Sequence, residues 1–218
     1  MVEFTAWDIL RNLLLAARWT IMLSAVAFVG GAVVGIAILL LRISKRKWAR
    51  RFASGYISVF QGTPLLMQLF LMFFGLPMLG FRIEPWTAAA LALTLCASAY
   101  LGEIWRGGVE ALPKGQWDAG ASLGLHYVQE LRLIILPQAL KVIFPALTSQ
   151  IVIMMLESAV VSQIAVRELT YEADMLQART YRAFETYLVV TLVYLALSMA
   201  LRRSLVAIGR RTLSAGVS

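Results

Sequence analysis

Residues 19–41, WTIMLSAVAFVGGAVVGIAILLL, contain no charged side chain. As an α-helix these 23 residues would be about 34 Å long, which is enough to cross the hydrocarbon core of a bilayer. Gly31 and Gly35 stand four residues apart, so one face of this helix offers two small residues at which another helix can approach closely. Chance glycines in a membrane helix are the alternative. The run predicts a transmembrane helix.

The composition of the whole chain supports a membrane protein. Of the 218 residues, 60% are hydrophobic and 15% are charged, whereas soluble domains average about 45–50% and about 25%. The net charge is +8, but the basic residues flank apolar runs, so membrane topology explains them better than nucleic-acid binding. The single cysteine, Cys96, excludes an internal disulfide.

Five spans are expected in a single transmembrane domain, 1–218. Their approximate bounds are 19–41, 58–79, 85–105, 138–164 and 186–208.

Two local features accompany these spans. Gly62-Thr63-Pro64 interrupts the second one, and its proline predicts a kink. Ahead of the first span, Trp7 to Ala17 mixes apolar and polar residues and predicts an interfacial helix.

Basic residues set the expected orientation. With the C-terminus inside, 14 of the 20 Lys and Arg residues fall in cytoplasmic segments. Cytoplasmic loops carry an excess of basic residues. We therefore expect the N-terminus outside, the C-terminus in the cytoplasm, and the long loop 106–137 on the cytoplasmic side.

That loop contains the most informative pattern. Residues 114–124 read KGQWDAGASLG, nine residues follow, and residues 134–137 read IILP. The pattern predicts a short helix, a glycine break and a second short helix ended by proline. Such a loop is suited to docking against a soluble partner, although an ordinary surface loop is the alternative.

The same pattern resembles the EAA loop of ABC importer permeases, which reads Glu-Ala-Ala, three residues, Gly, nine residues and Ile-x-Leu-Pro. The spacing matches without a gap, with Asp118 in place of Glu and Gly120 in place of the second Ala. Asp118 has a shorter reach than Glu.

Other stretches narrow the resemblance to permeases for polar amino acids, the His/Glu/Gln/Arg/opine group. Phe60-Gln61-Gly62-Thr63-Pro64-Leu65-Leu66 is similar to their Phe-Arg-Gly-Thr-Pro-Leu-Leu, with Gln61 replacing Arg. Ser98-Ala99-Tyr100, followed by Glu103 and Arg106-Gly107-Gly108, also looks like that group. The resemblance covers nearly the whole chain.

This resemblance implies an all-α membrane protein with the type I ABC importer permease (MetI-like) fold, in the bacterial inner membrane. The chain would be a transport subunit rather than an enzyme, with no cofactor of its own. It has no phosphate-binding loop, so ATP and Mg would be bound by a partner ATPase. The residues implied in coupling to that ATPase are Asp118, Ala119, Gly120, Gly124, Leu136 and Pro137. A second permease subunit, identical or homologous, and a periplasmic substrate-binding protein complete the implied partners.

An ionisable residue within a span is a functional candidate. Glu157 lies about 30 Å beyond Pro137 along a helix, near the expected outer end of the fourth span. Gln150 stands seven positions earlier on the same face, and Gln61 and Gln68 are also seven apart. Our hypothesis is that these stripes line the translocation path, and that Glu157 meets the amino or other cationic group of the substrate. Alternatively, Glu157 caps the span at the interface.

Further residues have structural interpretations. Gly62 and Pro64 are expected to shape the second span. Glu103 and Arg106 can meet on one helical face, as an ion pair at the membrane edge or as a gate. No spacing suggests a metal site, and His126 lies on the loop without a second ligand nearby.

Two other function classes stay open at this point. One is a secondary transporter driven by an ion gradient, and the other is a small intramembrane enzyme.

Overall fold

The structure, a computed structural model, describes residues 6–214, and within that range it contains helices and turns but no strand. Residues 1–5 and 215–218 of the predicted domain lie outside this description. Four helical segments are long and apolar enough to cross a membrane, and a fifth span is possible if a bent pair of helices counts as one. The four are α1 (Ala6–Arg42), α5 (Pro85–Glu110), the segment Tyr127–Ile164, and α10 (Ala183–Ser214). The all-α membrane fold is therefore confirmed, with four spans or, if the bent pair is counted, five.

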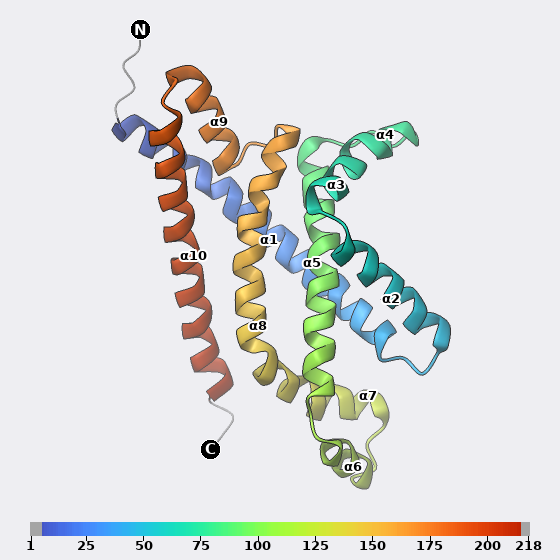
Figure 1. Cartoon of the computed structure of the whole chain (residues 1–218). Helices are drawn as coiled ribbons and strands as arrows, with labels where there is room; N and C mark the ends of the chain where they lie inside the picture. Colours follow the sequence, from blue (N-terminus) through green and yellow to red (C-terminus); the bar gives the residue numbers. More distant parts are fainter. Residues whose placement is uncertain (1–5, 215–218) are drawn as a thin grey trace.

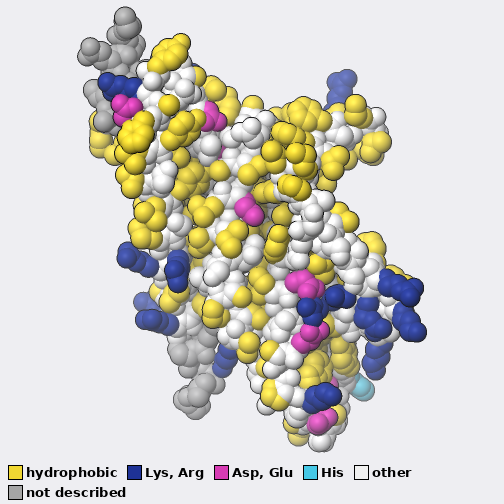
Figure 2. Space-filling model, in the orientation of Figure 1, with side chains coloured by type: hydrophobic (Ala, Val, Ile, Leu, Met, Phe, Trp, Pro, Cys, Tyr) yellow, Lys and Arg dark blue, Asp and Glu magenta, His cyan; other side chains and the backbone are white. Residues whose placement is uncertain are grey.

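The spanning helices run between two ends of the molecule (Figure 1). In that view α5, α8 (Leu136–Glu157) and α10 are roughly parallel, and α1 crosses them obliquely. The short helices α6 (Lys114–Ser122) and α7 (Tyr127–Glu130) gather at one end, and α9 (Leu169–Thr180) lies at the other. Figure 2 shows Lys and Arg side chains mostly over the end that carries α6 and α7.

The packing of α1 against α5 is the most extensive contact between any two helices. A Cβ atom added to Gly31 would lie 2.8 Å from the Cβ of Ala97, and one added to Gly35 would lie 3.1 Å from the backbone oxygen of Ser98. Both distances are shorter than ordinary van der Waals contact. The two glycines therefore form the close-approach surface that their spacing predicts, and α5 is the helix that occupies it.

Helix α1 differs from the prediction in its length. The expected interfacial helix, 7–17, is continuous with the first span, and α1 extends over 37 residues. No glycine or proline separates the two parts, so nothing ends the helix. Leu13, Ala16 and Ala17 are buried in a cluster with residues of α9 and α10. The segment is thus the beginning of the first span rather than a separate helix, and part of its apolar surface packs against protein.

The second predicted span, 58–79, crosses a sharp break in the structure. Helix α2 (Lys47–Gly62) ends at Gly62, and the following helices bend away from it by 105°. They are α3 (Leu65–Phe70), a π-helical turn (Leu71–Gly75) and α4 (Leu76–Met78).

Thr63 is extended at the break, and Pro64 has no N–H to continue the helix. The amide nitrogen of Gln68 donates to the backbone oxygens of Phe60 and Thr63 at 2.9 and 3.0 Å. A side chain therefore satisfies two carbonyls that the break leaves without helical partners.

The second short helix of the loop does not end at Pro137. Helix α7 runs through a π-helical turn, Leu131–Ile135, directly into α8, where Pro137 lies in the first turn. Proline lacks the N–H that would continue the helical hydrogen bonds, and a π-helical turn next to it is the kind of local adjustment that accommodates proline within a membrane helix. A 3₁₀ segment, Ser158–Ile164, completes this membrane helix. Similarly, α5 continues past the predicted end at 105 to Glu110.

We predict that Gly31→Ala lowers the midpoint of thermal unfolding of the purified protein by several degrees. The added methyl group would contact Ala97 and push α1 away from α5, and overpacking of this kind costs typically about 1–3 kcal/mol. Gly55→Ala in α2 is the matched control, because nothing lies within 4 Å of its Cβ position. An equal midpoint in both variants would contradict the close crossing.

Candidate functional sites

The turn between α6 and α7 is a helix C-cap that requires glycine. Gly124 has a φ of +70°, in the left-handed region. Its N–H donates to the oxygen of Ala121 at 2.9 Å, and the N–H of Leu125 donates to the oxygen of Gly120 at 3.2 Å. This pair of bonds is the Schellman motif. A side chain at position 124 would strain the turn, which explains the glycine physically.

Side chains fasten the two short helices into one unit, which we call the helical hairpin (residues 114–130). The rings of Trp117 and Tyr127 stack at 5.8 Å with an interplanar angle of 15°. The Gln138 amide on α8 donates to the side-chain oxygen of Gln116 at 2.8 Å. The hairpin is therefore held against the beginning of α8.

Gly120 and Glu130 fit together inside the hairpin. A Cβ atom on Gly120 would lie 2.8 Å from Cγ of Glu130 and 2.9 Å from its Oε1. The Glu130 side chain is buried, and its Oε1 has no hydrogen-bond partner among the residues that the structure describes. Gly120 stands where the EAA motif has its second Ala. The close approach of Glu130 explains why this chain has glycine there.

The outer surface of the hairpin is exposed and partly apolar. Asp118 and Ala119 are exposed, and the Asp118 carboxylate forms no ion pair within residues 6–214. Leu123 is 76% exposed and Val128 is 70% exposed. Apolar side chains displayed beside an unpaired carboxylate form a surface suited to docking another protein. Leu136 and Pro137 lie apart from this surface, in the first turn of α8.

An ion network joins the ends of α1 and α5 next to the hairpin, and a hydrogen bond connects it to the middle of α2. The Arg106 guanidinium donates to both carboxylate oxygens of Glu103, at 2.9 and 3.0 Å, and also pairs with Glu110. Arg42 at the end of α1 pairs with Glu103 at 3.4 Å and donates to Ser54 on α2. The ion pair that the spacing of Glu103 and Arg106 predicts is therefore part of a larger cluster.

Glu157 lies deeper than its sequence position suggests. It is half-buried at the end of α8, about one turn beyond Met154, which packs in a cluster with Ala92, Leu93 and Ala97 of α5. Cys96, next to Ala97 in the chain, is 11 residues beyond Pro85, about 16 Å along α5 from the end of the bundle. The carboxylate thus faces the middle of α5 rather than its outer end.

The glutamines of the two predicted stripes separate into different roles. The Gln61 amide donates to the oxygen of Ala99 at 3.3 Å, which places it on the same stretch of α5 as Glu157. Gln150 is buried on α8, in the helix that carries Glu157. Gln68 is 5% exposed, and its side-chain amide donates a hydrogen bond to a backbone carbonyl at the helix break. The structure brings Gln61 and Glu157 toward one segment of α5, whereas Gln68 holds the chain's own backbone.

A polar cluster at the other end of the molecule was missed by sequence reasoning. Glu168 is fully buried and accepts hydrogen bonds from Thr20 of α1 at 3.3 Å, Tyr194 of α10 at 2.8 Å and the N–H of Tyr171 at 2.8 Å. Burial raises the pKa of the Glu168 carboxyl, and these hydrogen bonds oppose the rise. Its place at the N-cap of α9 was the available sequence signal. Three helices are joined through this one carboxyl.

No group of three His, Cys, Asp or Glu side chains with metal-binding geometry occurs between residues 6 and 214.

Comparison with protein families adds an independent observation. Residues 31–214 match the family model of the inner membrane component of binding-protein-dependent transport systems. The chain belongs to this family. It is thus an ABC transporter permease of the bacterial inner membrane, and this membership leaves no support for an ion-driven carrier or an intramembrane enzyme.

Curated relatives of the permease align over most of its length. It is 35% identical over 182 residues to a probable glutamine ABC transporter permease of Bacillus subtilis, covering 84% of each chain. The arginine transport system permease of the same organism is 37% identical over 183 residues, with 84% of each chain covered. The glutamine transport system permease of Escherichia coli is 33% identical over 207 residues and 94% of each chain.

Solved structures agree with the arrangement of helices. The permease matches a chain of a crystal structure of an amino acid ABC transporter with histidines at a TM-score of 0.85 and 38% identity, covering 92% of this chain and 94% of the other. A chain of the methionine ABC transporter, in an inward-facing conformation, matches at a TM-score of 0.77 and 22% identity, covering 91% and 95%. The type I importer permease fold is therefore confirmed.

We predict that Gly120→Ala destabilises the hairpin and that adding Glu130→Ala removes the effect. The methyl group of the single variant would overlap Glu130, and truncating Glu130 makes room for it. Hydrogen–deuterium exchange of the purified permease should show faster exchange over residues 114–130 in Gly120→Ala alone. A double-mutant cycle without coupling would contradict the steric match, since residues in contact are coupled by about 0.5–3 kcal/mol.

Proposed function

We propose that this permease translocates a polar amino acid inward across the bacterial inner membrane, driven by ATP hydrolysis in a separate subunit. One observation carries the proposal: the helix that starts in the hairpin at Tyr127 continues through α8 to Glu157. Movement of the docking surface therefore moves the membrane carboxylate as part of the same element. This arrangement supports alternating access driven from outside the chain.

The hairpin would be the contact with the ATPase. Asp118 and Ala119 are exposed there, and Gly124 holds the turn that presents them. ATP and Mg would be bound by that partner. A second permease subunit, identical or homologous, would complete the pathway, and a substrate-binding protein would deliver the amino acid on the outer side.

The proposed orientation places the hairpin in the cytoplasm and the N-terminus outside. Figure 2 supports it, because Lys and Arg side chains gather over the end that carries α6 and α7. Cytoplasmic segments of membrane proteins are enriched in these residues.

The substrate path would pass along the middle of α5. Glu157 offers a negative charge to an amino group or another cationic group of the substrate, while Gln61 and Gln150 offer amides. Relatives named for glutamine and arginine transport support a substrate of this class. Gln68 contributes to the path only indirectly, by holding the break between α2 and α3.

Glu157→Gln should impair uptake of a labelled amino-acid panel in vesicles that hold the assembled transporter. The amide keeps the shape of the side chain but loses the charge, so we expect at least about a tenfold rise in KM for the transported amino acid. Glu185→Gln is the control, because this carboxylate is exposed at the start of α10. Unchanged affinity and rate in Glu157→Gln would rule out the proposed contact.

Gly124→Asp should prevent co-purification of the ATPase with the permease. A side chain at this left-handed position costs conformational energy, and aspartate also adds a negative charge to the docking surface that contains Asp118. Gly55→Asp introduces the same charge on α2, away from the hairpin, and should retain the ATPase. If both variants retained the ATPase and still took up substrate with ATP, the hairpin would not be the site that couples the permease to the ATPase.

A further inference from the structure

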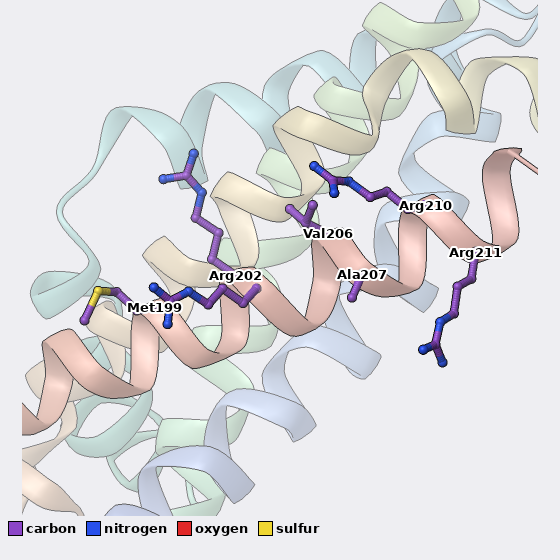
Figure 3. Close-up of a pocket in the computed structure, with 7 residues that line it drawn as sticks. Met199, Arg202, Val206, Ala207, Arg210 and Arg211 are labelled. Carbon is purple, nitrogen blue, oxygen red and sulfur yellow. The ribbon is translucent and has the colours of Figure 1, made fainter.

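The inner end of α10 carries four arginines, Arg202, Arg203, Arg210 and Arg211. The two pairs are eight residues apart, about 12 Å along the helix. Figure 3 shows Val206 between Arg202 and Arg210, and the side chains of Arg210 and Arg211 extending to opposite sides of the helix. Cations therefore surround this end of α10.

A cleft between α8 and α10 brings a cation of the other helix to the same place. We call it the α8–α10 cleft. It measures about 500 Å³, and its lining includes Lys141, Phe144, Thr148 and Ser149 of α8 with Arg202 and Val206 of α10. The ring of Phe144 lies against Gly209, so the two helices are in close contact at this level. The cleft thus has positive charge on both walls and hydroxyl groups on one.

Within the described part of the chain, two cations of this cleft, one on each wall, have no acidic side chain as partner. Among residues 6–214, no ion pair involves Lys141 or Arg202. By contrast Arg42, which lines a separate basic hollow on α2, pairs with Glu103 and Ser54. Positive-inside topology requires basic residues near the cytoplasmic surface, but not their convergence from two helices on one cleft.

Apolar side chains adjoin these cations. Met199 is 44% exposed one turn before Arg203, and Val206 and Ala207 line a neighbouring hollow of about 670 Å³ that also contains Arg202. A free inorganic anion would use the arginines but not this apolar surface. A ligand with an anionic head and hydrocarbon chains would use both.

We propose that the α8–α10 cleft binds the phosphate headgroup of an anionic phospholipid, with its acyl chains along the apolar side of α10. Guanidinium groups bind phosphate oxygens in a bidentate manner, and basic pockets between membrane helices suit such headgroups. This site goes beyond the transport proposal. It requires only that this end of α10 lies at a membrane surface.

The test is native mass spectrometry of the assembled transporter in detergent, titrated with phosphatidylglycerol or phosphatidylcholine. Wild-type protein should bind phosphatidylglycerol more tightly than phosphatidylcholine. The variant Lys141→Gln/Arg202→Gln should bind phosphatidylglycerol at least about tenfold more weakly. The control Lys45→Gln/Arg46→Gln removes two exposed charges outside both basic hollows and should bind as wild type does.

Several results would overturn the site. The site is overturned if wild type and the cleft variant bind phosphatidylglycerol with equal affinity. It is also overturned if equimolar inorganic phosphate displaces the lipid, because that result indicates a site for a free anion. Loss of subunit assembly in the cleft variant alone would mean that another protein covers this face. Substrate-stimulated ATP hydrolysis by the transporter in phosphatidylcholine membranes is measured in parallel. Absence of this stimulation would count against the transport proposal, whatever the result of the lipid titration.

Discussion

The close crossing of α1 and α5 determines where the other helices can lie. Gly31 and Gly35 let the backbones approach until a methyl group would no longer fit, and small residues on α5 complete the contact. Without water to drive association within a bilayer, such packing is the main source of helix–helix affinity. Helices α2 and α8 then pack on α5, and α9 and α10 pack on α1. The segment Cys96–Tyr100 of α5 therefore lies between the break after α2 and the end of α8, which is where the membrane polar groups meet.

Polar side chains in this permease differ in whether they form hydrogen bonds within the chain. Gln68 donates to backbone carbonyls that a helix break leaves open, and Glu168 joins Thr20 and Tyr194 at the outer end. These groups stabilise the chain's own structure. Glu157 has no such hydrogen bond among the described residues, although it lies one turn from Met154, which packs against the middle of α5. An unpaired carboxylate at that depth costs free energy. This cost distinguishes Glu157 from the glutamines Gln150, Gln61 and Gln68 of the two predicted stripes.

The sequence allowed prediction of features that depend on local chemistry. Uncharged runs indicated the spans, Pro64 indicated the break, and the spacing around Gly124 indicated the hairpin. Features that depend on tertiary contacts were not accessible. The depth of Glu157 was misjudged because its position along one helix does not determine which residues of the neighbouring helix α5 it faces, and that depends on how the two helices pack. The burial of Glu130 was not predicted, since it depends on the fold of the hairpin around Gly120. The equal spacing of Gln61 and Gln68 suggested one role for two side chains that contact different carbonyls.

The steric match of Gly120 with Glu130 has a consequence for the exchange of parts between related transporters. If only the first helix of the hairpin, α6, were grafted from a permease with alanine at position 120, it would bring one methyl group too many, unless residue 130 were replaced with it. Natural divergence faces the same restriction, because either change alone leaves an overlap or a void inside the hairpin. The two positions are thus expected to vary together among descendants of this chain, and recombination boundaries should fall outside the interval between them.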